Sequence, residues 1–164
     1  MSHRRLRLDD VRFIAIAAMA ENRIIGSGNQ LPWHVPEDFR WFKSKTVSKT
    51  LLMGRKTLES LGKPLPKRRT IVLSRSGFSV EGATVVASLD ELGSVLTEPE
   101  LWVCGGAEIY TLTLPRWDEL YLSVIEGEFS GDAFFPAFED RMVGGEVVHE
   151  GKGFQVRHYV NRRR

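Results

Sequence analysis

Strand-like and helix-like segments alternate along the whole chain, and this alternation restricts the fold more than any other feature of the sequence. We expect strands over residues 13–20, 50–54, 70–74, 83–87 and 101–104, and helices over 36–46, 55–61, 89–96 and from the Gly105-Gly106 pair to residue 114. A further segment follows at 119–126, and 146–150 and 155–161 have the character of a closing antiparallel pair. Such alternation is typical of an α/β fold.

Local signals mark several of these boundaries. Pro36 suits the first position of a helix, because its missing N–H group costs nothing there. Gly62 and Pro64 end the helix at 55–61. Ser88, with Glu91 three residues later, predicts a capping box at the start of the 89–96 helix.

The size of the chain indicates a single domain. Its 164 residues can bury one hydrophobic core, and no linker, internal repeat or low-complexity stretch divides them. We expect this domain over residues 13–161, between a basic extension at 1–12 and a basic tail at 162–164.

The apolar run at 13–20 follows several arginines and so resembles a secretion signal. Asp9 and Asp10 interrupt the basic stretch, and the run lies at the short end for a signal, so a buried first strand fits better. No apolar run approaches the length of a membrane span. The single cysteine, Cys104, excludes an internal disulfide and permits a reducing compartment, so we expect a cytoplasmic protein.

The charge is divided unevenly between the ends of the chain and its body. Residues 1–12 carry a net charge of +2 and residues 162–164 carry +3, so the rest carries −3 within a formal net charge of +2. The basic pI of about 8.8 therefore belongs to the two ends and not to a binding face. This distribution counts against a nucleic-acid-binding module, although the ends could still touch an anionic partner weakly.

Asp38 lies among bulky apolar residues in the segment 31–42. If Pro36 begins a helix, Asp38 falls in its first turn, and Phe42 lies one turn further on the same face. A carboxylate held there can accept two parallel hydrogen bonds from a flat, nitrogen-rich ring, with Phe42 packed beside it. The alternative from this segment alone is a surface acid that only complements the helix dipole.

Residues 21–35 precede this helix and form a fifteen-residue loop that contains Gly26, Gly28 and Pro32. Loops of this length without structure are unusual in a compact domain and tend to be functional lids. We therefore expect the loop and Asp38 to frame a pocket.

Three segments place glycine or a hydroxyl at the carboxyl end of a predicted strand, where open α/β sheets bind ligands. They are Met53-Gly54-Arg55-Lys56-Thr57, Leu73-Ser74-Arg75 and Val103-Cys104-Gly105-Gly106-Ala107-Glu108-Ile109-Tyr110. The first lacks the glycine spacing of a P-loop, and the third lacks the dinucleotide fingerprint. Each could be an ordinary turn, but together on one sheet edge they indicate an extended, multiply charged cofactor.

Arg68 follows the proline-rich segment 64–66. The prolines stiffen the approach, so this arginine could grip a carboxylate with two hydrogen bonds. A basic surface loop is the alternative.

A series of short motifs extends from about Phe13 to Tyr159. Its members are Ala17-Ala18, Ile24-Ile25-Gly26, Leu31-Pro32-Trp33, Pro36-x-Asp38, Phe42, Met53-Gly54-Arg55-x-Thr57, Pro64-Leu65-Pro66-x-Arg68, Leu73-Ser74, Gly105-Gly106-x-x-Ile109-Tyr110 and Gly131-Asp132-x-x-Phe135-Pro136. In this order they resemble the dihydrofolate reductase family. The resemblance implies a single-domain α/β fold with a twisted, mainly parallel eight-stranded sheet flanked by helices. It also implies NADPH-dependent reduction of 7,8-dihydrofolate to tetrahydrofolate, with antifolates as inhibitors.

The resemblance also implies the site residues. Catalytic positions are Asp38, Trp33 and Leu31, and substrate contacts are Ile16, Asp38, Phe39, Phe42, Lys63, Arg68, Cys104, Tyr110 and Ser123. Among these, Asp38 would bind the pteridine, Ser123 would support Asp38, and Arg68 would pair with the glutamate carboxylate of folate.

The implied cofactor is NADPH, and no metal is implied. Its contacts would be Ala18, Ile25, Gly26, Asn29, Gln30, Gly54, Arg55, Lys56, Thr57, Leu73, Ser74, Arg75, Cys104, Gly105, Gly106, Ala107, Glu108, Ile109 and Tyr110, with a cis peptide bond between Gly105 and Gly106. Arginines beside a hydroxyl favour the 2′-phosphate and hence NADPH over NADH.

Three residues depart from the family pattern. Cys104 stands where an aliphatic residue is usual, Ala87 where some relatives place a basic cofactor contact, and Glu108 where relatives often have a cation. We expect these to affect cofactor affinity and not the reaction.

A related pyrimidine reductase of riboflavin synthesis shares the fold, but would not be expected to carry both Leu31-Pro32-Trp33 and Asp38. A binding-only module that uses its arginine-rich ends is the other alternative. We expect a monomer that binds neither specific nucleic acid nor membrane.

Overall fold

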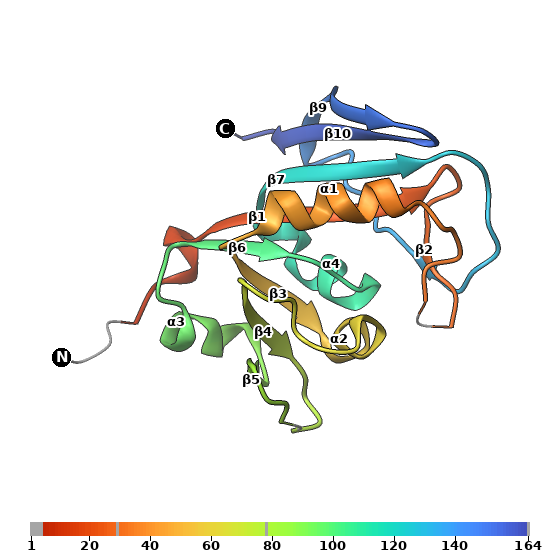
Figure 1. The fold of residues 1–164 in the computed structure, drawn as a ribbon. Helices are drawn as coiled ribbons and strands as arrows, with labels where there is room; N and C mark the ends of the chain where they lie inside the picture. Colours follow the sequence, from red (N-terminus) through yellow and green to blue (C-terminus); the bar gives the residue numbers. More distant parts are fainter. Residues whose placement is uncertain (1–4, 29, 78, 164) are drawn as a thin grey trace.

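The computed structural model describes residues 5–28, 30–77 and 79–163, in which eight strands form one twisted sheet (Figure 1). From one edge to the other, the order is β5 (Ala83–Val86), β4 (Arg69–Leu73), β3 (Thr50–Gly54), β6 (Glu100–Val103), β1 (Arg12–Ala20), β7 (Trp117–Ile125), β10 (Phe154–Asn161) and β9 (Met142–Gly151). Neighbours from β5 to β7 are parallel, and β10 and β9 close the sheet in antiparallel pairing. The expected mainly parallel eight-stranded sheet is therefore confirmed.

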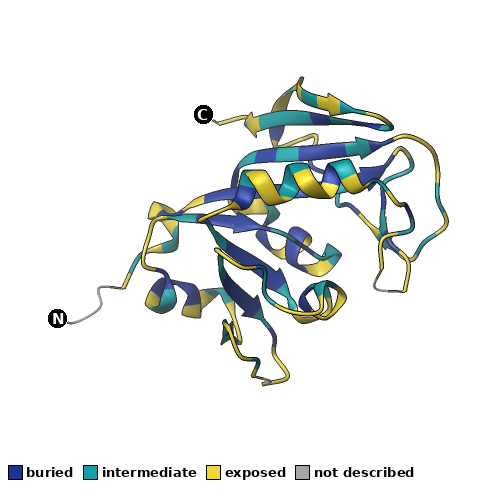
Figure 2. Ribbon diagram, in the orientation of Figure 1, coloured by how far each residue is buried: buried dark blue, intermediate teal, exposed yellow. Residues whose placement is uncertain are grey.

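Alternate residues of β1 pack on opposite faces of the sheet. Phe13 and Ala15 belong to a core cluster with α3 (Leu92–Val95) and α4 (Ala107–Thr113). Ile14 and Ile16 point to the other face, where they pack with residues of α1 (Pro36–Thr46) and α2 (Arg55–Leu61). The strand is apolar on both sides because both faces of the sheet are covered. Figure 2 shows the buried strands and the exposed outer side of α1.

Most predicted boundaries agree with the structure to within two residues, but the segment 89–96 does not form one helix. A 3₁₀ helix over Leu89–Glu91 precedes the four-residue α3. The Ser88 side chain makes no capping bond, and the Glu91 carboxylate instead accepts a hydrogen bond from the Ala87 N–H at 2.6 Å. The prediction of a capping box was therefore wrong. The last predicted helix ends at Thr113, and a 3₁₀ turn over Leu114–Arg116 leads into β7.

The loop at 21–35 contains a strand that the sequence did not indicate. This strand, β2 (Ile24–Gly26), pairs in antiparallel fashion with β8 (Ala133–Phe134) in a small second sheet. A Cβ atom added at Gly131 would lie 2.4 Å from the Gly26 carbonyl oxygen, so this close approach requires glycine.

Residues before β1 lie along the core instead of leaving it. Leu6 and Leu8 pack against the first core cluster, and Val11 is buried. A short 3₁₀ helix (Leu8–Asp10) leads into β1, and Figure 1 shows this segment beside α3. The division of the chain at residue 12 stays a prediction. No helix in the described part of the chain is long and apolar enough to cross a membrane.

Candidate active site

A cleft of about 2010 Å³ opens at the carboxyl ends of the parallel strands. Its lining includes Ile16, Ala17 and Ala18 of β1, Gly54 at the end of β3, Leu73 at the end of β4, Cys104 after β6 and Ser123 of β7. Residues of α1, α2, α4, β8, the 21–35 loop and the segments 74–76 and 87–90 also line it. The location agrees with the general position of ligand sites in open α/β sheets.

Asp38 lies in the first turn of α1 and lines the cleft, although only 8% of its surface is exposed. Burial raises its pKa, because a charged carboxylate loses its hydration, and this effect is opposed by a hydrogen bond with Ser123 and by the nearby His149. Ser123 is itself buried on β7. Asp38 and Ser123 thus form a polar pair inside an apolar wall, and the role of Ser123 as a support of Asp38 stays a prediction.

Aromatic residues of α1 flank this pair. Phe39 and Phe42 stack with ring centroids 5.9 Å apart, and both line the cleft. Phe39 is 39% exposed, a large fraction for an aromatic ring beside a pocket. Their faces are available to a flat ligand held by Asp38.

Tyr110 of α4 is buried at the inner wall of the cleft. Its hydroxyl donates a hydrogen bond to the Ile16 carbonyl oxygen at 2.7 Å. Burial, with Cys104 and Asp38 nearby, raises the pKa of Tyr110 well above its ordinary value, so this hydroxyl keeps its proton. The Ile16 carbonyl retains a second lone pair for a ligand.

Cys104 directly follows β6 and is partly buried at the cleft wall. Its thiol lies 3.6 Å from the Trp102 carbonyl oxygen. Burial raises the pKa of Cys104 strongly, so the group remains a thiol at neutral pH. Because the thiolate is the nucleophilic form, Cys104 is a wall residue and not a nucleophile.

Gly105 and Gly106 are joined by a cis peptide bond, as predicted. The Gly54 N–H donates to the Gly105 carbonyl at 2.8 Å, which ties the end of β3 to the end of β6. Gly105 has a φ of +103°, and a Cβ atom there would lie 2.9 Å from the Tyr110 ring. A Cβ atom at Gly54 would lie 3.1 Å from Ile109. Only glycine fits this junction comfortably.

Cationic and hydroxyl groups gather at another part of the cleft. Arg55, Lys56 and Thr57 begin α2, and Ser74, Arg75 and Ser76 follow β4; all six line the cleft. The Arg55 guanidinium donates to Ser76 Oγ at 3.1 Å and to Glu59 at 3.4 Å. The Ser74 and Ser76 hydroxyls are 3.0 Å apart. This end can bind an anionic group such as a phosphate.

The profile of the family described as "Dihydrofolate reductase" matches residues 12–150 of this chain. The chain belongs to the dihydrofolate reductase family. It is 44% identical over 146 residues to the dihydrofolate reductase type A13 of Escherichia coli, which covers 85% of this chain and 88% of that protein. It is 46% identical over 127 residues to the dihydrofolate reductase of Bacillus subtilis, or 76% of each chain.

A solved structure gives the same answer for the fold. The dihydrofolate reductase of Enterococcus faecalis complexed with NADP(H) and RAB-propyl superposes with a TM-score of 0.81 and 32% identity, covering 92% of this chain and 96% of the other. Family membership therefore rests on both sequence and architecture.

Most site residues that the family resemblance implied line the cleft. The described ones that do so are Ile16, Ala18, Ile25, Gly26, Gln30, Leu31, Trp33, Asp38, Phe39, Phe42, Gly54, Arg55, Lys56, Thr57, Leu73, Ser74, Arg75, Cys104, Gly106, Ala107, Glu108, Ile109, Tyr110 and Ser123. Lys63, Arg68 and Gly105 do not line it, and Asn29 lies outside the described residues. The individual roles of all these residues stay predictions.

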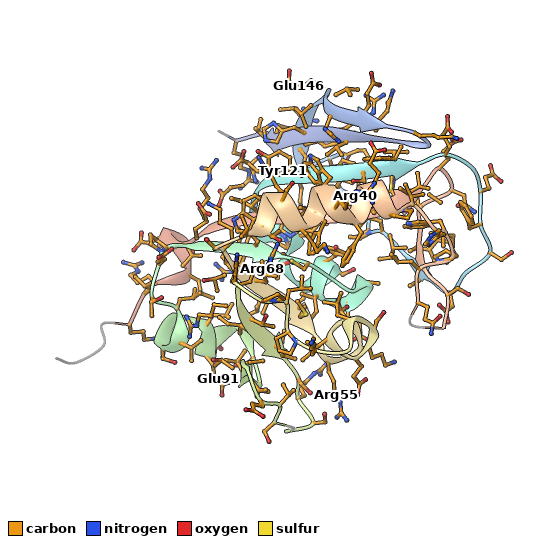
Figure 3. The ribbon with its side chains drawn as sticks, in the orientation of Figure 1. Arg40, Arg55, Arg68, Glu91, Tyr121 and Glu146 are labelled. Atoms are coloured by element: carbon orange, nitrogen blue, oxygen red, sulfur yellow. The ribbon has the colours of Figure 1, made fainter. Side chains whose placement is uncertain are left out.

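Arg68 lies beside the carboxyl end of α1 (Figure 3). Its guanidinium donates to Thr46 Oγ1 at 3.2 Å, to the Pro66 carbonyl at 2.6 Å and to the Lys43 carbonyl. Since a guanidinium has five N–H donors, two are left to bind a carboxylate. The hydrogen bonds fix the group at the end of a helix, where a positive charge is favourable.

In this family member the 21–35 loop is tied down by the Gly131-Asp132 motif. The Asp132 N–H donates to the Gly26 carbonyl at 3.1 Å, and its carboxylate accepts from the Gly28 N–H at 3.3 Å. Trp33 is buried in the loop against Phe129, at 5.8 Å between ring centroids, whereas Leu31 is 55% exposed at the cleft. The loop thus has one anchored side and one apolar side facing the cleft.

Several cleft residues had no predicted role. The most prominent are Arg40, Ser76, Asp90, Leu112, Asp132 and Phe134. Asp132 belongs to a motif that the sequence did display, so it could have been found. The others are single residues brought to the cleft by tertiary packing, without a local signal.

Proposed function

We propose that this chain reduces 7,8-dihydrofolate to 5,6,7,8-tetrahydrofolate with NADPH as the hydride donor. Family membership supports the reaction, and the relatives in Escherichia coli and Bacillus subtilis are named for it. The solved structure from Enterococcus faecalis contains NADP(H). The observation that carries the proposal is the buried Asp38–Ser123 pair, which lines a cleft in a chain of this family.

At this pair, the Asp38 carboxylate accepts parallel hydrogen bonds from the N3–H and 2-amino groups of the pteridine. The geometry favours this arrangement because a buried carboxylate needs partners, and Ser123 supplies only one. Phe42 packs against the ring. The carbonyl oxygens of Ile16 and Cys104 suit the 4-amino group that antifolates carry. The Arg68 guanidinium binds the glutamate carboxylate with its two remaining donors.

The other end of the cleft fits the adenosine and phosphate part of the cofactor. Arg55, Lys56 and Arg75 supply positive charge, and the Ser74 and Ser76 hydroxyls supply hydrogen bonds to a 2′-phosphate. Gly106 has no side chain, so a pyrophosphate can approach its backbone closely. Ala18 and Ile25 line the nicotinamide.

NADPH, when bound, supplies the hydride that C6 of the pteridine accepts. In this orientation Asp38 holds the edge of the ring opposite N5, so it cannot protonate N5 directly. We assign that proton to water, while the ionised Asp38 polarises the ring. Leu31 and Trp33 position the 21–35 loop over the nicotinamide, where it excludes bulk water. Holding the two rings face to face is the main contribution of the protein.

A single assay tests the proposal. Purified protein should oxidise NADPH only when dihydrofolate is present, as followed by absorbance, and methotrexate should stop the reaction. Glu37→Gln, which alters the neighbouring acid in the same turn, should remain active, since Glu37 does not line the cleft. Absence of dihydrofolate-dependent turnover would refute the proposal. Turnover of the pyrimidine substrate of riboflavin synthesis instead would favour the related reductase.

We also propose that the chain acts as a monomer in the cytoplasm. The lone Cys104 agrees with a reducing compartment. Light scattering after gel filtration should give a mass near 18.6 kDa, and a mass twice as large would contradict the monomer.

A further inference from the structure

The segment before β1 is attached to a part of the cleft wall. We define residues 5–8 as the N-terminal arm. The Leu6 N–H donates to the Gly93 carbonyl of α3 at 2.8 Å, and the Arg5 guanidinium donates to the Asp90 carbonyl. Leu6 and Leu8 pack against the same core cluster as Leu89 and Leu92. The arm is therefore held by both hydrogen bonds and apolar contacts.

The contact between the arm and α3 is unusually close. A Cβ atom added at Gly93 would lie 2.1 Å from the Leu6 carbonyl oxygen. Gly93 is buried, so a larger residue could not turn its side chain to solvent. Glycine at this position lets the backbone of the arm lie directly on α3.

The arm touches the back of a segment whose front lines the cleft. Residues 87–90 all line the cleft, and Asp90 also borders a hollow of about 210 Å³ formed with Arg5, Leu6, Arg7, Leu8 and Gly93. We call residues 87–90 the 87–90 wall. The wall follows β5, whose Val86 carbonyl accepts a hydrogen bond from the Ser74 N–H at 2.9 Å. It therefore stands beside the hydroxyl and cationic groups of Ser74, Arg75 and Ser76.

The wall has little support of its own. Ala87, Ser88 and Asp90 are exposed, and the Ala87 N–H donates to the carboxylate of Glu91, the residue that directly follows the segment; Leu89 packs against the core cluster. The α3 helix that follows is only four residues long, which is too short to be stable without tertiary contacts. The arm supplies such contacts on the side away from the cleft.

We infer that the N-terminal arm is a positioning element of the cofactor site, which holds the 87–90 wall against the adenosine end of NADPH. The inference rests on the proposed function, since it assigns that end of the cleft to the cofactor. Loss of the arm should let the wall move and so weaken binding of the dinucleotide. The affinity for ligands at the substrate end of the cleft, where Asp38 lies on α1, should not change.

The main test compares Leu6→Ala combined with Arg5→Ala against Arg163→Ala. The control removes the same charge from the other end of the chain, at a residue outside the cleft. We expect the dissociation constants of NADPH and of 2′,5′-ADP, measured by calorimetry, to rise about fivefold in the arm variant, the factor that corresponds to one net hydrogen bond of about 1 kcal/mol. The dissociation constant of methotrexate and kcat at saturating NADPH should stay unchanged.

Arg5→Ala alone covers the case in which the double variant does not fold. It removes only the contact to Asp90 from an exposed side chain, and it should weaken 2′,5′-ADP binding about twofold, since one surface contact is lost.

The inference would be overturned by equal affinities for 2′,5′-ADP in the wild type and the arm variants, or by equal weakening of methotrexate. A lower melting temperature with unchanged affinities would leave the arm a purely stabilising element and would also overturn it. None of these outcomes bears on the proposed function, which would be refuted only if the wild type does not reduce dihydrofolate.

Discussion

The two ends of the cleft differ in how far their polar groups are exposed to solvent. At one end, Asp38 and Ser123 are 8% and 2% exposed and are joined by a hydrogen bond. At the other end the Arg55 side chain is 43% exposed, and Arg75 and Ser76 are exposed as well. At a buried position water cannot replace a lost hydrogen bond, so one misplaced polar group greatly weakens binding. Exposed charges are screened by salt, and several of them act on the same ligand, so each one contributes less. Changes at the buried end should therefore be severe, and changes at the exposed end moderate and dependent on salt.

Asp38→Asn tests the buried end most directly and should have the largest effect. The amide cannot accept two charge-assisted hydrogen bonds, so we expect kcat/KM for dihydrofolate at neutral pH to fall about a hundredfold or more. Stopped-flow measurement of hydride transfer, with Glu37→Gln as control, checks this result. A variant with the full rate of hydride transfer would contradict both the role of Asp38 and the contrast between the ends.

Arg75→Ala tests the exposed end. Removing one cation should raise the dissociation constant of NADPH about tenfold at low salt, and less at high salt because the interaction is screened. NADH, which lacks the 2′-phosphate, should bind equally well to variant and wild type. Lys67→Ala is a suitable control, since Lys67 is exposed but does not line the cleft. A change in the NADPH dissociation constant that does not depend on salt would contradict the contrast between the exposed and the buried end of the cleft.

Ser123→Ala should have a smaller effect than either change and should alter a pH profile. The Ser123 hydrogen bond lowers the pKa of Asp38, so its loss raises that pKa further. Because the ionised carboxylate binds substrate, the acid limb of kcat/KM should move to higher pH, with a loss of about fivefold near that limb. Ser123→Thr, which keeps a hydroxyl, should restore the profile. An unmoved acid limb would show that Asp38 titrates independently of Ser123.

The smallest effect concerns stability without ligands. Burial raises the pKa of Asp38 above its value in the unfolded chain, so the free energy of unfolding should decrease as the pH rises through the folded-state pKa. Asp38→Asn removes this titration. The ligand-free variant should therefore be more stable than the wild type at neutral pH, with the difference vanishing at acid pH. Urea unfolding across that pH range checks this, and parallel stability curves would contradict it.

Local signals predicted the ends of elements well where a residue's own backbone preference marks the boundary. Pro36 begins α1 and Gly62 follows α2, as their backbone preferences require. The strand β2 was missed because it depends on pairing with β8, more than a hundred residues away. Glu91 was misassigned because its carboxylate accepts from the Ala87 N–H, one residue before the predicted N-cap, and the Ser88 side chain makes no capping bond.

The site was predictable where a motif reports a backbone requirement. The close junction at Gly54 and Gly105 is of this kind, and Asp38 was found because Pro36 fixes the start of its helix. Ser76 and Asp90 belong to no such motif. They are ordinary turn residues in the sequence, and they reach the cleft because β4 and β5 pair side by side in the sheet. The bond from Arg68 to the Lys43 carbonyl of α1 likewise had no sequence signal, since it depends on where the helix ends.

Cys104 gives this chain a built-in reporter of its own opening. It is the single cysteine of the sequence, and in the folded state burial raises the pKa of its thiol, so little reactive thiolate exists. Unfolding returns the thiol to ordinary acidity in water. The rate at which a disulfide dye labels the unmodified protein therefore follows the population of open molecules, and a drug that fills the cleft slows that colour change without any engineered probe.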